Sequence, residues 1–153
     1  MKNLKKTSLL LALVSIITIG FTSCHKDDHM PGKPVIKLSE VGHKDSKHAH
    51  PGHDLHLEAT ITAHGLIKQI EITIQQEGEN SFLIKKTFSE GQYIGVRNAK
   101  FHEHIDIPAE APLGKYQLHF VVTDQRGQLA KATSPLEVVK DDGTEEHEEH
   151  HHK

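Results

Sequence analysis

The sequence predicts an all-β protein, an immunoglobulin-like antiparallel β-sandwich of about seven strands. Apolar and polar residues alternate with a period of two along several segments, and turn residues separate those segments. No segment shows the apolar spacing of an amphipathic helix. The number and spacing of the strands are typical of a sandwich, and an open barrel is the competing architecture.

The clearest strand covers residues 54–63, where five apolar side chains share one face of the predicted sheet. Six further segments are predicted as strands: 34–38, 70–75, 81–88, 101–107, 116–122 and 128–139, the last of them interrupted at Pro135. Side chains on the apolar faces should form the core: Leu55, Leu57, Ile61, Ile70, Ile72, Ile105, Ile107, Tyr116, Leu118 and Phe120.

The first 23 residues have the features of a secretory signal peptide. Lys2, Lys5 and Lys6 precede an apolar run from Leu9 to Phe21. That run is shorter than the roughly 20 apolar residues that a membrane-spanning helix needs. The single cysteine, Cys24, follows directly, so no disulfide can form within the chain.

The residues around Cys24 resemble the lipobox of bacterial lipoproteins, through the run Phe21-Thr22-Ser23-Cys24. This resemblance implies that the signal is cut before Cys24 and that Cys24 carries lipid. The alternative is an ordinary signal peptide that ends near a free cysteine. A lone thiol would be a liability in an oxidising compartment, so we favour the lipoprotein interpretation.

Two further resemblances extend this interpretation. The segment Cys24-His25-Lys26-Asp27-Asp28 is similar to the surface-export signal of Bacteroidetes lipoproteins, which implies an outer-membrane anchor and display on the cell surface. The segments 52–59, 101–108 and 114–120, with Thr123-Asp124 and Gly127, look like a family of Ig-like lipoproteins of unknown function from Bacteroidetes. That family implies a sandwich at the cell envelope and no particular activity.

The chain therefore divides into four predicted parts. Residues 1–23 are the signal peptide, 24–33 a polar tether, 34–139 the Ig-like sandwich and 140–153 a His/Glu-rich tail. The tail has many charges and no core-forming residues, which predicts disorder.

The charge balance argues against nucleic acid as a partner. Without the three signal lysines the chain has 15 basic and 21 acidic residues, a formal charge of −6 with histidine neutral. No nucleophile elbow, His-Glu-x-x-His helix or phosphate-binding loop is present in the sequence. We therefore expect a protein that is not an enzyme.

Histidine is the unusual component, with 15 residues, all of them after the signal peptide. Most histidines are neutral at pH 7, and the neutral imidazole is the form that binds metals. His102 and His104 are two positions apart on a predicted strand, so both side chains point to one face. If residues 54–63 and 101–107 are the second and fifth strands of the sandwich, they are neighbours, and His56 joins that face.

The set His56, His102 and His104 is thus the predicted metal site. Further ligands or hydrogen-bond acceptors for the imidazoles could come from the same face or the nearby loop: Asp54, Glu58, Asp106, His48, His50 and His53. The tail offers a looser set: His147, His150, His151 and His152. His119 is also predicted to point outward, but on the other sheet. Imidazole and carboxylate ligands without thiolate suit Zn²⁺, with Cu²⁺ and Ni²⁺ as alternatives.

Two functions follow from this pattern. The first is a lipid-anchored envelope protein that captures, buffers or delivers a divalent transition metal, with an outer-membrane transporter or another envelope protein as a partner. The second is a surface Ig-like module for interaction or adhesion, in which the histidines serve only as polar surface residues.

Overall fold

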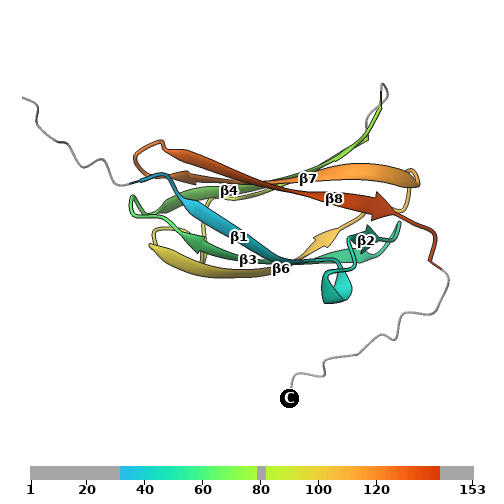
Figure 1. The fold of residues 1–153 in the computed structure, drawn as a ribbon, viewed down its shortest axis with the longest axis horizontal. Coiled ribbons are helices and arrows are strands. Elements are labelled where there is room, and N and C mark those ends of the chain that lie inside the picture. The colour runs from blue at the N-terminus through green and yellow to red at the C-terminus, as the bar shows by residue number, and fades with distance from the viewer. Residues whose placement is uncertain (1–31, 79–81, 142–153) are drawn as a thin grey trace, which may run out of the picture. The chain divides into compact units, whose positions relative to one another are not determined.

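Two β-sheets face each other in the computed structural model, which describes residues 32–78 and 82–141 (Figure 1). Cys24 and the four tail histidines lie outside the described residues, as do most of the predicted tether and tail. The described part contains one short 3₁₀-helix, η1 (His43–Asp45), and these strands: β1 (Val35–Val41), β2 (His48–Ala49), β3 (Asp54–Thr62), β4 (Ile67–Gln76), β5 (Leu83–Phe88), β6 (Asn98–Asp106), β7 (Gly114–Asp124) and β8 (Leu129–Val138).

The order of the strands confirms the predicted all-β sandwich. One sheet has the order β1-β3-β6, and the other has the order β2-β8-β7-β4-β5. The three strands of the small sheet, β1, β3 and β6, correspond to strands A, B and E of an immunoglobulin domain, while β4, β5, β7 and β8 correspond to C, C′, F and G. No helix in the described residues is long and apolar enough to cross a membrane.

Two details differ from the prediction. The histidine-rich segment before β3 contributes an additional short strand, β2, which pairs in parallel with the end of β8, so the sandwich is not wholly antiparallel. The last strand also continues through Pro135, which lies opposite Gln117 of β7. On the side of β8 away from β7, the strand β2 pairs only with Glu137 and Val138, so no strand of the described chain pairs with Pro135 on that side. The missing N–H of Pro135 is therefore tolerated.

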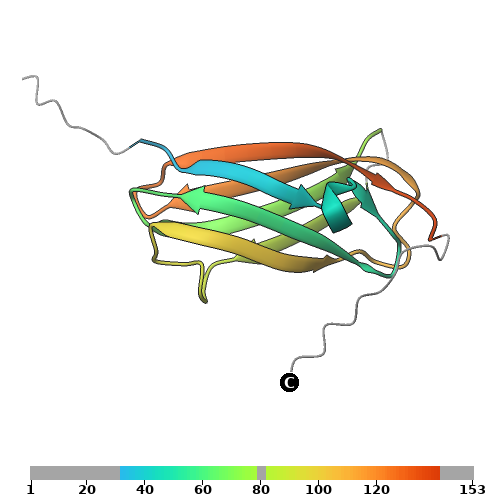
Figure 2. The same ribbon diagram turned by 60° about the horizontal axis from the view of Figure 1, so that its bottom comes forward.

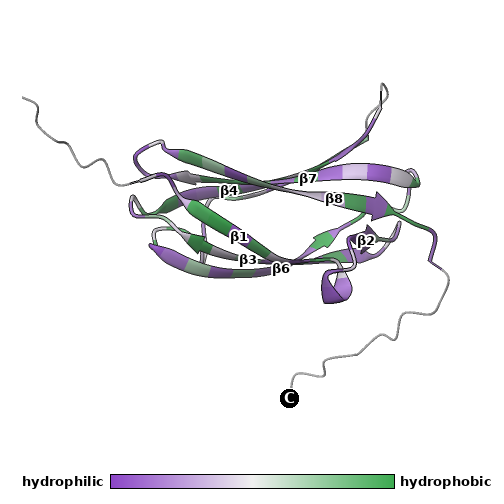
Figure 3. Ribbon diagram, in the orientation of Figure 1, coloured by the Kyte–Doolittle hydropathy of each residue, from purple (hydrophilic) through white to green (hydrophobic). Residues whose placement is uncertain are grey.

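The space between the sheets is filled by the apolar faces of the strands. All ten predicted core residues are buried, and Figure 3 shows hydrophobic and hydrophilic residues interleaved along the strands. Phe101 of β6 contacts Phe120 of β7 edge to face, with ring centroids 5.1 Å apart. This aromatic pair joins the two sheets across the core.

Candidate metal centre

The pairing of β3 with β6 brings the predicted histidines together. In the antiparallel register His56 lies opposite His104, and Glu58 lies opposite His102. The two strands are neighbours, as expected for the second and fifth strands of an immunoglobulin sandwich. All four side chains therefore point to the outer face of the three-stranded sheet, which Figure 2 turns toward the viewer.

The main-chain hydrogen bonds explain why these side chains come close. The His56 carbonyl oxygen accepts a hydrogen bond from the N–H of Gly42, the residue that follows β1. The main-chain polar groups of His56 therefore point away from β6. The main-chain groups of His102 meet the hydroxyl of Tyr93 on the opposite side of β6. His56–His104 and Glu58–His102 are therefore non-hydrogen-bonded pairs, in which opposite Cα atoms are about 4.5 Å apart rather than about 5.5 Å.

The three imidazoles form a compact group. The ring centroid of His56 lies 4.8 Å from that of His102 and 5.1 Å from that of His104. One nitrogen from each ring can be chosen so that all three lie within 4.8 Å of one another. Tetrahedral Zn²⁺ with bonds of about 2.0–2.1 Å needs nitrogens about 3.3 Å apart, so modest side-chain rotations would close the group on an ion.

Carboxylates surround these rings on the same face. Oε1 of Glu58 lies 3.2 Å from Nδ1 of His102 and 3.5 Å from Nε2 of His56. Nδ1 of His104 contacts the carboxylate of Asp54. Asp106 lies opposite Asp54 in the register, but it belongs to neither of the metal-competent groups found in the described residues. A cation held by the imidazoles would thus meet negative charge on two sides.

Glu40 is a site residue that the sequence analysis missed. Its Oε1 lies 3.8 Å from Nε2 of His56, and Glu40, His56 and Glu58 form a second metal-competent group that shares His56. A bulge in β1 between Leu38 and Glu40 explains its position. Leu38 packs against the core, and without the bulge Glu40 would share that inward face.

The other predicted histidines lie elsewhere. His48 is exposed on β2, at the edge of the five-stranded sheet. Nδ1 of His50 lies 3.2 Å from the carbonyl oxygen of Val139, and Nε2 of His53 lies 3.3 Å from Oδ2 of Asp141. These two residues join the turn before β3 to the chain that leaves β8. None of the three belongs to the group around His56.

His119 lies on the outer face of the five-stranded sheet, as predicted, between Thr73 of β4 and Thr133 of β8. Partial burial lowers the pKa of its imidazole, and the positive charge of Lys131 lowers it further. Its Nδ1 has no hydrogen-bond partner among the described residues. His119 is therefore a neutral histidine held apart from the metal-competent group.

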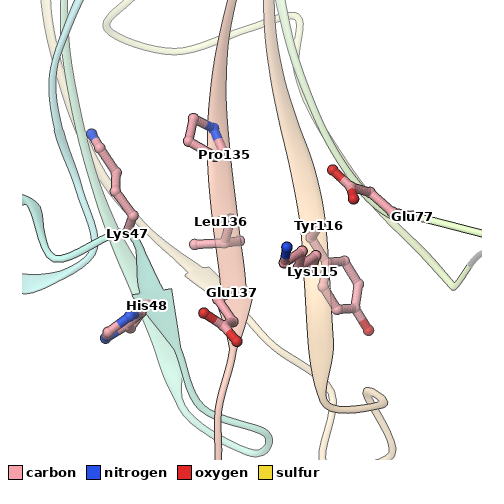
Figure 4. Close-up of a pocket in the computed structure, with 8 residues that line it drawn as sticks. All are labelled: Lys47, His48, Glu77, Lys115, Tyr116, Pro135, Leu136 and Glu137. Atoms are coloured by element: carbon pink, nitrogen blue, oxygen red, sulfur yellow. The ribbon is translucent and has the colours of Figure 1, made fainter.

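A pocket of about 360 Å³ lies on the five-stranded sheet, between β2, β7 and β8 (Figure 4). Its charged lining residues have both signs, with Lys115 of β7 opposite Glu137 of β8. The pocket includes His48 but none of the histidines on β3 or β6. It is thus separate from the candidate metal centre.

The solved structures that resemble this chain belong to proteins of low sequence identity. Wild-type OgpA from Akkermansia muciniphila is 12% identical over 70% of this chain and 29% of its own, with a TM-score of 0.51. The sporulation control protein Spo0M from Bacillus subtilis is 12% identical over 72% of this chain and 51% of its own, with a TM-score of 0.47. The chain thus spans less than a third of OgpA and about half of Spo0M, and at this identity the likeness to OgpA shows the fold alone.

A search of curated proteins found no match. A family profile, in contrast, matches residues 22–139, which include the whole sandwich and the segment around Cys24. That family is described as a domain of unknown function, DUF4625. Because the match covers more than half of the sequence, this chain belongs to the DUF4625 family.

Proposed function

We propose that this protein binds a divalent transition metal ion at the cell envelope, with His56, His102 and His104 as the ligands. The observation that supports this most strongly is the convergence of three imidazoles from two neighbouring strands on one sheet face. A polar surface needs no such convergence, because scattered hydrophilic side chains would solvate the sheet equally well.

The donor set favours Zn²⁺. Three imidazole nitrogens leave a fourth coordination position, which Glu58 or water can occupy. The side chains of His102 and His104 are 57% and 55% exposed, so an ion can enter and leave from solvent. Cu²⁺ and Ni²⁺ accept the same ligands, so competition between the three ions for the site would show which ion the protein prefers.

The sequence before the sandwich supports a location on the outer membrane. The lipobox-like residues before Cys24 and the Lys26-Asp27-Asp28 segment support a surface lipoprotein of Bacteroidetes type. At that location an exposed, exchangeable site would capture or buffer metal and deliver it to a transporter or another envelope protein. This proposed role requires binding and release of the ion rather than catalysis.

Metal titration of a suitable variant tests the proposal. The protein should begin after Cys24 and carry alanine at the four tail histidines, His147, His150, His151 and His152, so that the tail cannot bind the added ion. We prefer these substitutions to truncation, because Val139 and Asp141 contact His50 and His53. Calorimetry with Zn²⁺ should show one ion per chain, and the ion should raise the melting temperature.

The ligands are then tested by the double change His102→Ala and His104→Ala. It should abolish both the binding and the thermal shift, whereas the matched change His48→Ala and His64→Ala removes two exposed histidines elsewhere and should preserve both. Because imidazole binds metal only when neutral, affinity should also fall below about pH 6.5. Lack of binding in the tail-substituted protein would overturn the metal function and favour the interaction module.

A further inference from the structure

The hydroxyl of Tyr93 meets both main-chain polar groups of one proposed metal ligand. It donates a hydrogen bond to the carbonyl oxygen of His102 at 3.0 Å, and it accepts one from the His102 N–H at 3.4 Å. β6 is an outer strand of its sheet in the described structure, with β3 on its other side. A single side chain thus takes the place that a neighbouring strand would occupy at His102.

Tyr93 is itself held firmly in the core. The residue is 6% exposed, and its ring centroid lies 4.9 Å from that of Phe101 and 6.2 Å from that of Phe88. The loop that carries it, between β5 and β6, is fixed to the start of β4 by two main-chain hydrogen bonds, from Gly95 to Ile67 and from Ile67 to Val96. The hydroxyl therefore has a defined position relative to both sheets.

From this geometry we infer that Tyr93 is a positioning residue for the metal site, which fixes the backbone of His102 so that its imidazole stands beside His56 and Glu58. This inference rests on the proposed metal function. An outer strand that lacks a partner can shift or fray, and a shift at His102 would move one of three ligands. Groups that hydrogen-bond to the side chain of a metal ligand typically change metal affinity by about 10- to 100-fold when they are removed, and we expect a group that holds the main chain of a ligand to act at the lower end of that range.

The change Tyr93→Phe tests this role, because it removes the hydroxyl and keeps the ring. In the tail-substituted protein it should weaken Zn²⁺ binding about tenfold. The matched control is Tyr116→Phe, which removes the hydroxyl of another buried tyrosine, on β7 of the five-stranded sheet. That hydroxyl donates a hydrogen bond of 2.8 Å to the carbonyl oxygen of Pro112. The control should lose some thermal stability and leave the affinity for Zn²⁺ unchanged.

Two further measurements separate positioning from general stability. In a His102→Ala background, Tyr93→Phe should cause no additional loss of affinity, because the ligand that it positions is gone. In the metal-free protein, Tyr93→Phe should speed amide hydrogen exchange at His102 more than at residues of β7. The exchange measurement needs no metal, so it reports on the contact even where binding fails.

The outcomes can be distinguished. If the parent binds Zn²⁺ and Tyr93→Phe leaves its affinity unchanged, or if Tyr116→Phe weakens binding equally, the positioning role is wrong and the metal function stands. If the parent binds no metal, both proposals are overturned, whatever the exchange at His102. A loss of affinity in Tyr93→Phe that disappears in the His102→Ala background would establish the role.

Discussion

Histidines on the two outer faces of this sandwich have opposite electrostatic surroundings. His56, His102 and His104 each lie beside a carboxylate, from Glu58 or Asp54. His119, by contrast, lies between two threonines and near the positive charge of Lys131. The first surroundings favour a cation and the second disfavour one, so residue type alone does not define the site.

The lowered pKa of His119 predicts a measurable effect on stability. Because its folded-state pKa is below the usual value of about 6.5, the unfolded chain takes up the proton first as pH falls. His119 therefore contributes a loss of stability as pH falls through about 6.5, and His119→Thr, which matches the flanking Thr73 and Thr133, should lose less stability than the parent. Urea unfolding at about pH 7.5 and about pH 5 measures this difference.

The matched control for this experiment is His64→Thr, which changes an exposed histidine in a turn. It should keep the pH dependence of the parent more closely than His119→Thr does. Equal losses of stability in the parent and in His119→Thr would contradict the assigned role of burial.

Gly65 is a second residue with a specific steric requirement. A Cβ atom built on Gly65 would lie 2.2 Å from Oδ2 of Asp124, which is fully buried. Oδ1 of Asp124 accepts hydrogen bonds from the N–H groups of Arg126 and Gln128, at 2.9 and 2.8 Å. The carboxylate therefore cannot move aside without breaking the turn between β7 and β8.

We accordingly expect Gly65→Ala to lower the free energy of unfolding by about 1–3 kcal/mol, as overpacking of a filled site usually does. Gly32→Ala is the control, because a Cβ atom at Gly32 would meet none of the described residues within 4 Å. The midpoints of urea unfolding give the comparison. An unchanged midpoint in Gly65→Ala would mean that Asp124 can relocate at little cost.

At the scale of the strands, the sequence predicts most of what builds the site. Strict alternation in β3 and β6 identifies which residues face outward, and the immunoglobulin order makes the two strands neighbours. Together these fix His56, His102 and His104 on one face. The ten predicted core residues are buried for the same reason, because alternation leaves each strand only one apolar face.

Features that interrupt the alternation could not be predicted in this way. The bulge in β1 turns Glu40 outward, and no periodic pattern in Val35–Val41 signals it. The two-residue strand β2 is too short to show a period, and it depends on the partner strand β8. Tyr93 lies in a loop, so its contact with His102 follows from tertiary packing alone.

The bulge predicts a modest electrostatic contribution from Glu40. Glu40→Gln removes one negative charge near His56 and keeps an oxygen that can accept the hydrogen bond from the Lys44 N–H. Zn²⁺ binding should weaken by about two- to fivefold, the range of a partly exposed charge interaction. Glu71→Gln, which breaks the 2.8 Å ion pair with Lys85 on the other sheet, is the control. Equal effects from both changes would exclude a local role for Glu40.

For the whole molecule, the length of chain between Cys24 and the sandwich matters. Cys24 lies eleven positions before the first residue of β1, Val35. An extended chain of that length spans at most about 40 Å. If Cys24 carries lipid, the sandwich can therefore stand clear of the headgroups while remaining within reach of other proteins in the same membrane.

Lipid attachment at Cys24 predicts that Cys24→Ser releases the protein from the membrane fraction of its native host. Stable anchoring needs more than one acyl chain, and lipoprotein processing at the cysteine supplies them. Immunoblots of the membrane and soluble fractions measure the release. The released protein should still bind Zn²⁺, because the proposed anchor and the proposed metal site share no residues. Replacing Lys26, Asp27 and Asp28 by alanine should leave the protein on the membrane but protect it from protease added to intact cells. If Cys24→Ser protein remains in the membrane fraction, the anchor lies elsewhere and the lipoprotein interpretation is wrong.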